Sequence, residues 1–305
     1  MYNQNSGWGA AAMAALPLAL TGKVFVVGDA STANLDMVQQ IFDRVDPDGT
    51  LRFFSTIDAA LSHCTANAGD VILVCPGHTE TISSATSLVV DVAGVQIIGI
   101  GRGSDRPELN FSNTAGSVEM DAANTRLSNL ILKADVSAVV VGVNVDADNV
   151  EIDHCQFTFN ATGDDFVTMI DVDAVNGAYI HDNEFIAEDT AGCDEAIRLD
   201  DADDVKIVGN HIYGDFSDSA IVGEGAVGKN LLVQGNTIYN SDTTAGLCID
   251  LNVAFTGLLV KNALGGLVAA GVAGVLDPGS CLCIENFGTN AIDESSAAVP
   301  TTAST

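Results

Sequence analysis

A phrase of about 26 residues recurs along the chain from about residue 120 and limits the folds open to it. Each copy has a small acidic turn, a strand of alternating apolar residues, an Asn-like position and one more apolar residue. The copies read DAANTRLSNLIL, DADNVEIDHCQF, DAVNGAYIHDNEF, DADDVKIVGNHI, GAVGKNLLVQGNTI and, more weakly, NVAFTGLLVKNAL. The Asn-like positions, spaced 26, 28, 27, 26 and 26 residues apart, are Asn129, Cys155, Asn183, Asn210, Asn236 and Asn262. Such regular spacing indicates a repeat architecture.

The composition of the repeat is typical of a parallel β-solenoid. It is rich in Val and Ile, punctuated by Gly, Asn and Asp, and poor in helix formers. Stacked coils lie about 4.8 Å apart, so equivalent side chains form ladders, and buried Asn side chains satisfy one another's amide groups. The Asn-like column is therefore predicted to be structural. A second column, spaced 25, 27 and 28 residues apart, contains Asp121, Asp146, Asp173 and Asp201.

The chain divides into four predicted parts. Residues 1–22 form an N-terminal arm, 23–90 an α/β cap, 91–266 the coils, and 267–305 a C-terminal cap and tail. Within the cap, strands are predicted at KVFVVGD and VILV, and a helix at NLDMVQQIFDRV. A shorter amphipathic helix is predicted after an N-cap at Ser55 or Thr56.

The cap resembles the opening of a known superfamily. TIDAALSHCTANAGDVILVCPGHTETI, followed by VQIIGIGRGSDRPELNF, is similar to the start of pectin lyase-like proteins, and the resemblance covers residues 54–265. It implies an all-β fold, a right-handed parallel β-helix with a small α/β N-terminal capping region. It does not specify activity, because the superfamily contains polysaccharide lyases, hydrolases, esterases, phage tailspikes and non-enzymatic virion proteins.

The charge of the chain excludes two classes of partner. The chain has 41 acidic residues, 31 of them Asp, and only 11 Lys and Arg residues, so its net charge is −30. Too few Lys and Arg remain to form a basic face for nucleic acid or an anionic membrane. No run reaches the roughly 18 apolar residues of a membrane span, and the apolar run 10–20 lacks the Lys or Arg that precedes a signal-peptide core.

The cysteines predict neither a disulfide framework nor a zinc site. Their number is odd, and they form no CxxC pair. Free, mostly buried thiols made in a reducing cytoplasm are expected at Cys64, Cys75, Cys155, Cys193, Cys248, Cys281 and Cys283.

No catalytic residue or organic cofactor site stands out. A lyase-like site would need a base among acids, and Arg198 in the stretch Glu195–Asp201 has that setting; the commoner alternative is an Arg that bridges to acids on a neighbouring coil. Glycoside hydrolysis needs two carboxyl groups, but the candidate pairs at 164–165, 171 with 173, 200–201 and 203–204 are too many to single one out. The five histidines share no column, so no histidine cluster is expected.

The Asp column allows two interpretations. In the first, each of Asp121, Asp146, Asp173 and Asp201 accepts hydrogen bonds from its own turn and faces solvent. In the second, Ca²⁺ or Mg²⁺ bridges some of these carboxylates.

These patterns favour a non-enzymatic bacteriophage virion protein, specifically a capsid decoration or cement protein on the outer capsid surface. The expected location is the virion, assembled in the host cytoplasm, with the major capsid protein or another virion protein as partner. The resemblance to phage proteins implies a homotrimer. The alternative is a tailspike-like or secreted β-helix that binds or depolymerises polysaccharide. The apolar arm is a candidate docking segment through Trp8, Met13, Leu16, Leu18 and Leu20.

Overall fold

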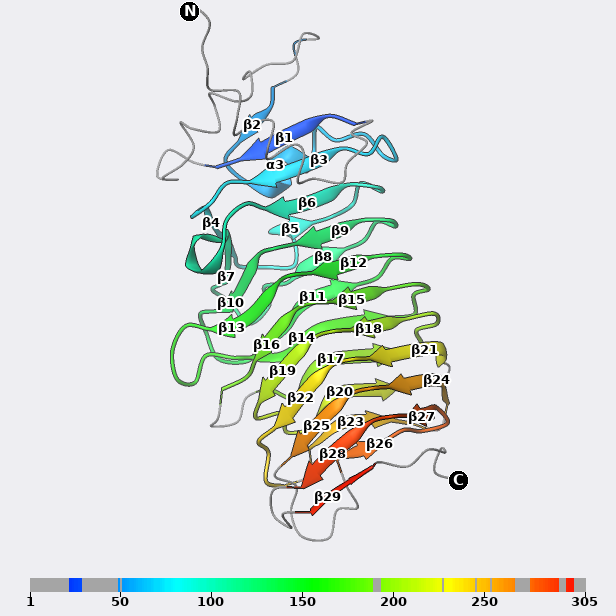
Figure 1. Cartoon of the computed structure of the whole chain (residues 1–305). Coiled ribbons are helices and arrows are strands. Elements are labelled where there is room, and N and C mark those ends of the chain that lie inside the picture. The colour runs from blue at the N-terminus through cyan, green and yellow to red at the C-terminus, as the bar shows by residue number, and fades with distance from the viewer. Residues whose placement is uncertain are drawn as a thin grey trace, which may run out of the picture.

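The computed structural model describes residues 22–28, 49, 51–188, 193–226, 228–244, 246–252, 254–266, 275–290 and 295–298. Three parallel sheets wind around one long core, and eight three-stranded coils run from β3 to β26 (Figure 1). The all-β parallel solenoid predicted from the repeat is thereby confirmed. No helix in the described ranges has the length and apolar character needed to cross a membrane.

The longest sheet has eleven strands, all paired in parallel. In spatial order they are β2 (Phe53–Phe54), β1 (Val24–Val27), β3 (Val71–Val74), β6 (Gln96–Gly99), β9 (Arg126–Ser128), β12 (Glu151–Asp153), β15 (Tyr179–His181), β18 (Lys206–Val208), β21 (Gly228–Gln234), β24 (Phe255–Val260) and β27 (Leu282–Ile284).

The second sheet has ten strands. From the C-terminal end they are β29 (Ser295–Ala298), β28 (Phe287–Asn290), β25 (Ala263–Gly266), β22 (Thr237–Asn240), β19 (His211–Gly214), β16 (Glu184–Ile186), β13 (Gln156–Phe159), β10 (Ile131–Ala134), β7 (Glu108–Phe111) and β4 (Thr79–Ile82). Only β29 is antiparallel to its neighbour, and it covers the last edge of this sheet.

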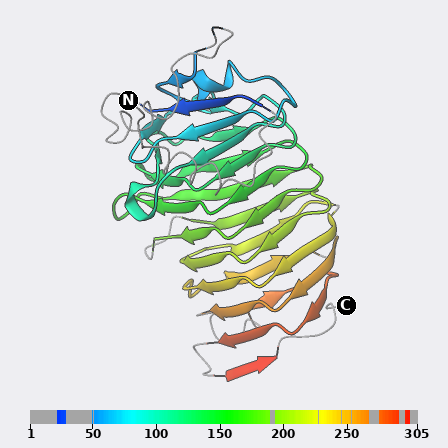
Figure 2. The same ribbon diagram turned by 45° about the horizontal axis from the view of Figure 1, so that its top comes forward.

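The third sheet has eight strands. They are β26 (Leu276–Asp277), β23 (Leu247–Leu251), β20 (Ser219–Glu224), β17 (Glu195–Asp200), β14 (Phe166–Asp173), β11 (Val139–Val145), β8 (Val118–Met120) and β5 (Leu88–Val89). Figure 2 shows the strands of each sheet lying side by side along the length of the solenoid.

Within the described ranges two short helices accompany the strands. The helix α3 (Ile57–Leu61) packs on β1, β2 and β3, and the Thr56 hydroxyl caps it by accepting from the amide of Ala59 at 3.2 Å. A single 3-10 turn, η1 (Gly103–Asp105), follows β6. The helix expected at 34–45 lies outside the described residues.

The coils extend beyond the boundaries that the repeat suggested. The first three-stranded coil is β3–β4–β5, so the solenoid begins at Val71 and not at residue 91. At the other end β26, β27 and β28 continue the three sheets past residue 266.

The core of the solenoid is a continuous column of apolar side chains. Inward positions carry Val, Ile, Leu and Phe in register, and Phe157 stacks on Phe185 of the next coil with ring centroids 4.8 Å apart. No coil is able to bury these faces alone, so the coils stabilise one another. The cysteines belong to this interior: all seven are free, and burial raises the pKa of Cys155 and Cys248 to about 12.

A column of buried asparagines lines the turn between the eleven- and ten-stranded sheets. Each side-chain amide donates to the side-chain oxygen of the next, at 3.1 Å from Asn183 to Asn210 and 3.1 Å from Asn210 to Asn236. The column continues through Asn262 to Asn286, which the repeat did not include. Each side-chain oxygen also accepts from the backbone amide of the preceding member, and each amide also donates to a carbonyl of the preceding coil.

The register corrects one predicted member of this ladder. Asp153 pairs with Ser128, so Cys155 aligns with Leu130, and Asn129 lies one position too early. Asn129 has φ 58° and occupies the left-handed turn position that His154 and Gly209 fill in later coils. Asn is common at both kinds of position because it tolerates the left-handed region. At Cys155 the backbone amide joins the ladder by donating to Asn183 at 2.8 Å, and the thiol donates to the Leu127 carbonyl of the preceding coil at 3.7 Å.

Candidate functional site

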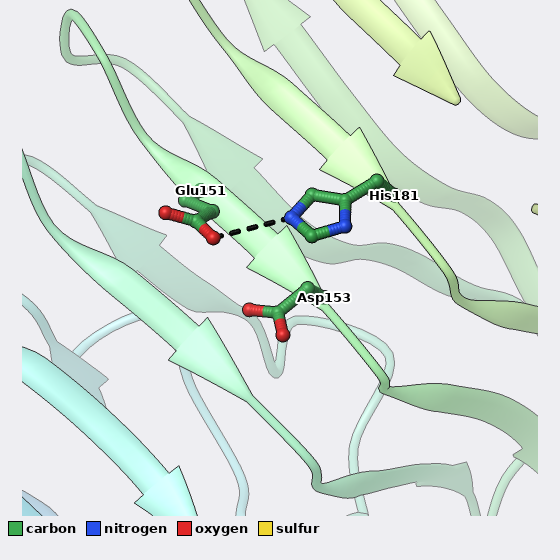
Figure 3. Close-up of side chains that lie close together, drawn as sticks. All are labelled: Glu151, Asp153 and His181. Atoms are coloured by element: carbon green, nitrogen blue, oxygen red, sulfur yellow. Dashed lines mark hydrogen bonds and ion pairs between the residues drawn. The ribbon is translucent and has the colours of Figure 1, made fainter. Parts of the chain in front are cut away.

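The densest cluster of charged side chains lies on the outer face of the eleven-stranded sheet. Glu151 and Asp153 project from β12, and His181 from β15, the next strand along the sheet (Figure 3). Alternation along each strand places positions two residues apart on the same face. Arg126 and Ser128 of β9 complete the cluster from the other side, because β9 pairs with β12.

Asp153 is fully buried, and its carboxylate is surrounded by donors. Arg126 donates to both of its oxygens, at 2.6 and 2.7 Å, and Ser128 donates at 2.9 Å. The His154 ring nitrogen Nδ1 lies 2.5 Å from the same carboxylate. Burial alone would raise the pKa of Asp153, but the hydrogen bonds from Arg126, His154 and Ser128 outweigh it and lower the pKa. Asp153 is therefore held ionised as an inter-coil ion pair.

His181 is fixed between two carboxylates and an aromatic ring. Its Nε2 lies 3.1 Å from Glu151 and its Nδ1 2.9 Å from Asp182, and its ring stacks on Tyr179 at a centroid distance of 3.9 Å. The His154 and His181 rings lie 6.2 Å apart. The expectation that the histidines stay apart is wrong for this pair, because the turn residue after β12 and the last residue of β15 become neighbours.

The cluster has the donor types of a metal site, but an arginine already supplies its positive charge. One ligand atom each from Glu151, Asp153 and His181 lies within 4.8 Å of the others. The Arg126 guanidinium occupies both oxygens of Asp153 and also lies 3.3 Å from Glu151. A cation bound there would face this fixed positive charge at close range. The side chains therefore link the neighbouring strands β9, β12 and β15 through ion pairs and hydrogen bonds.

A second cluster lies on the outer face of the eight-stranded sheet, around Arg198. Its guanidinium donates to both oxygens of Asp171 on the neighbouring strand β14, with Nε–Oδ1 at 2.9 Å. The hydrogen bond to Asp171 raises the pKa of Arg198 above its ordinary value. Of the two interpretations of Arg198, the structure shows the inter-coil bridge, and a permanently protonated arginine is not a base.

Glu195, on the same strand as Arg198, differs from Asp171 because it is not hydrogen-bonded to the arginine. It is 6% exposed, and it accepts a 2.6 Å hydrogen bond from the Thr168 hydroxyl. Burial raises its pKa by more than the Thr168 hydrogen bond and the Arg198 charge lower it, and the charges of Asp194 and Asp218 add smaller increases. A carboxyl with a raised pKa beside an ionised one is the pattern of a general acid.

The other predicted carboxylate pairs serve turns and coil contacts. Asp165 is buried and accepts from the backbone amide of Ala138 at 2.5 Å. Asp203 accepts from the backbone amide of Lys229 at 2.8 Å, and Asp204 from the Asn230 side chain at 2.9 Å. These contacts join residues 26 or 27 apart in the chain, so the carboxylates tie the turns of neighbouring coils together.

The Asp column at the end of the eight-stranded sheet differs from its prediction at one position. Asp173 pairs with Asp200, not with Asp201, and Asp200 pairs in turn with Glu224. Asp201 has φ 49° and accepts from the backbone amide of Ala226 at 2.6 Å, so it is a turn residue. The register of the strands aligns six acidic residues at or just after the strand ends. They are Asp91, Asp121, Asp146, Asp173, Asp200 and Glu224.

The carboxylates of this column raise one another's pKa. Burial raises the pKa of Asp146, and so do the charges of Glu119, Asp121 and Asp173. The pKa of Asp121 is raised in the same way by burial, then by Glu119 and Asp91. Ligand atoms of Glu119, Asp121 and Asp146 lie within 4.8 Å of one another, the spacing at which oxygen ligands share a cation.

The candidate docking residues of the arm, Trp8, Met13, Leu16, Leu18 and Leu20, lie outside the described residues. What the sequence missed is the pairing across coils: Arg126 with Asp153 and His181 with Glu151. Its only signal was that basic residues, rare in this chain, fall on outward strand positions of successive copies.

Three comparisons with known proteins gave few matches. No protein-family model matches the chain, and no curated protein gives a significant sequence match. Among solved structures, a rhamnogalacturonan lyase is 12% identical with a TM-score of 0.38, over 80% of this chain and 74% of that one. A double mutant of the tailspike protein of E. coli bacteriophage HK620 is 11% identical with a TM-score of 0.31, over 81% and 66%. Another double mutant of that tailspike, in complex with a pentasaccharide, is 12% identical with a TM-score of 0.30 over the same shares.

Identities and TM-scores this low carry nothing about activity. The three parallel sheets and their coil order are the observations that define the architecture. The chain is an all-β parallel solenoid built from three sheets.

Proposed function

We propose that the chain is a non-enzymatic structural protein of a bacteriophage virion, a decoration or cement protein on the outer capsid surface. The observation that supports it most is the state of the two clusters. Asp153 and Asp171 are each held by an arginine of an adjacent coil, so both carboxylates fasten neighbouring coils. An arginine paired with a carboxylate stabilises its charged form, which makes that carboxylate a weaker base.

The charge of the chain also suits this role. With a net charge of −30 and acids gathered at turn positions, the surface repels anionic macromolecules, including the polyuronates that lyases cleave. A carboxylate-rich exterior keeps a long solenoid soluble and discourages edge-to-edge association. Location in the virion and assembly in the host cytoplasm are parts of the same proposal, as is a homotrimeric state.

The proposed partner is the major capsid protein, bound through the arm. In co-sedimentation with capsids assembled from the capsid protein of the same genome, the full chain should pellet at a fixed ratio. The variant Leu16→Asp/Leu18→Asp should remain in the supernatant, because charged side chains oppose burial of an apolar strap. The matched control is Thr301→Asp/Thr302→Asp, which adds the same charge to the C-terminal tail and should still pellet. Failure of the unmodified chain to pellet would contradict the proposal.

A second candidate function rests on Glu195 alone. A buried carboxyl with a raised pKa, near the arginine-paired Asp171, is the combination that glycoside hydrolysis requires. In that case the protein would bind and depolymerise a polysaccharide, as a tailspike-like or secreted β-helix. Release of reducing ends from a panel of neutral and acidic polysaccharides separates this function from the structural one.

We also propose that Ca²⁺ or Mg²⁺ binds the Asp column. A carboxylate whose folded-state pKa is raised contributes stability below its unfolded pKa, and this contribution is lost as the pH rises through the folded pKa. The column should therefore destabilise the chain at neutral pH in chelator, and millimolar Ca²⁺ should raise the melting temperature there. Asp146→Asn should raise the melting temperature in chelator and reduce the Ca²⁺ effect, whereas Asp105→Asn on exposed η1 should do neither. An identical melt with and without Ca²⁺ would eliminate the cation.

A further inference from the structure

The described surface has one region where exposed apolar side chains gather. Seven large hydrophobic residues are exposed, and five of them lie on the last coils. Leu258 is 41% exposed, Leu282 44% and Ile284 39% on the eleven-stranded sheet; Tyr239 is 43% and Phe287 66% exposed on the ten-stranded sheet. We call these five residues the C-terminal patch.

Register and chain order connect four of the five residues, and Tyr239 lies two strands from Phe287 on the same sheet. Leu258 pairs with Leu282 on β27, and Val260 pairs with Ile284. Only the turn residues Glu285 and Asn286 separate Ile284 from Phe287, which begins β28. The patch therefore wraps the corner between the two sheets at the end coloured orange and red in Figure 1.

The same region is free of carboxylates on its strands. None of β18, β21, β24 and β27 contains Asp or Glu, and neither does any of β19, β22, β25 and β28. The third sheet of the same coils does contain them, at Glu224, Asp250 and Asp277. In a chain with 41 acidic residues, two adjacent acid-free faces over four coils are a marked exception.

Three lysines lie at the edge of the patch, two of them beside acids. Three of the five lysines lie on these coils, and the exposed Lys206 pairs in register with Leu232, the neighbour of Leu258. Lys229 and Lys261 have acidic partners, Asp203 and Glu285, at 3.8 and 3.6 Å. Within the described ranges Lys206 has no acidic partner, so an acid from another molecule is able to pair with it.

We propose that the C-terminal patch is an interface with a second copy of this chain. Two copies that each carry a charge of −30 repel each other, so they meet with least repulsion where the strands of both surfaces carry no carboxylates and acids are confined to the turns, as at Glu285. Apolar contact then removes the exposed Leu, Ile and Phe side chains from water. The rim acids of one copy, such as Glu285 and Asp203, supply partners for Lys206 of the other.

The size of the patch sets the strength of this contact. Four strands about 4.8 Å apart and three residues long give a footprint of roughly 200 Å² on each of the two faces. That area places the contact in the weak, concentration-dependent class and not among permanent interfaces. Added salt should strengthen it, because screening reduces the repulsion between the copies while leaving apolar contact intact.

Sedimentation velocity of the full chain over about 10 to 200 μM tests the proposal. The mass should rise with concentration, and more so at higher salt. Leu258→Asp and Phe287→Asp should each weaken association at least about tenfold, and Lys206→Glu should weaken it less. Val140→Asp is the matched control: Val140 is 57% exposed on the eight-stranded sheet, far from the patch in register, and its variant should associate normally.

Two results would overturn the proposal: a monomer over the whole range, or patch variants that associate as well as the unmodified chain. Binding of the patch to capsid protein or to a saccharide by a chain that stays monomeric would also overturn it, in favour of that occupant. Because both patch residues are exposed, the variants should melt within a few degrees of the unmodified chain; Leu282→Asn gives a second, milder change. The interface rests on the self-association that the proposed function includes and not on capsid binding through the arm, which co-sedimentation tests separately. A trimer whose mass is the same in the patch variants would overturn the interface and leave the proposed homotrimer standing.

Discussion

Replacing Asn210 by alanine should lower the free energy of unfolding by about 2–5 kcal/mol. Its side-chain oxygen accepts from the backbone amide of Asn183 at 3.0 Å, and its amide donates to the carbonyl of Ile180 at 2.9 Å. Asn210 is 1% exposed, so water does not replace these partners. Each buried backbone group left unpaired costs on the order of 1–3 kcal/mol.

Equilibrium unfolding in denaturant measures this loss, provided that the transition stays cooperative in a repeat protein. Asn160→Ala is the control, because Asn160 is exposed and its side-chain amide bonds only to the exposed side chain of Asp135. The control should change the free energy of unfolding by less than about 0.5 kcal/mol. Equal effects of the two substitutions would show that the asparagine column is not what holds the coils in register.

Replacing Arg126 by alanine should cost about 2–4 kcal/mol at neutral pH, because it leaves a buried carboxylate without its main partner. The Arg126 side chain is 28% exposed, whereas the Asp153 side chain is not exposed at all. Most of the lost stability therefore comes from the buried Asp153 carboxylate, which water does not reach. Lys133→Ala removes the more exposed Lys133–Glu108 pair, which has a 2.6 Å contact, and should cost no more than about 1 kcal/mol.

The pH dependence identifies the cause. In the unmodified chain the pKa of Asp153 is lowered, so its contribution is present above the unfolded pKa and is lost as the pH falls through the folded pKa. In Arg126→Ala burial should dominate and raise that pKa, so the variant should lose stability as the pH rises. The difference between the two proteins should therefore shrink from pH 7 toward pH 3. A difference that is constant with pH would mean that Arg126 acts through packing and not through Asp153.

The repeat predicted the solenoid because its period reports a physical constraint: each coil must return to the same place in the stack. The asparagines at 183, 210, 236 and 262 are recognisable for the same reason, since a buried amide column needs an amide in every coil. The errors at Asn129 and Asp201 have one cause. Both residues occupy left-handed turn positions, where Asn and Asp are favoured, next to columns that use the same residue types.

The clusters could not be predicted in the same way. The clusters join residues that occupy different repeat positions on neighbouring coils. The lengths of the turns between the strands determine which of these residues lie side by side. His154 and His181 are offset in the repeat, yet the 28-residue interval between Cys155 and Asn183 brings their rings to 6.2 Å. The raised pKa of Glu195 comes from burial and, to a smaller extent, from the charges of Asp194 and Asp218. The spacing of residues in the sequence reveals neither its burial nor the distances to these charges.

The central claim is that the polar clusters fasten coils and do not catalyse. The most direct test incubates the purified chain with a panel of neutral and acidic polysaccharides, and measures reducing ends and unsaturated products beside Glu195→Gln. We predict no product from either protein, and the same melting behaviour for the chain with and without saccharide. Product from the unmodified chain that disappears in Glu195→Gln would contradict the claim and establish Glu195 as a catalytic acid.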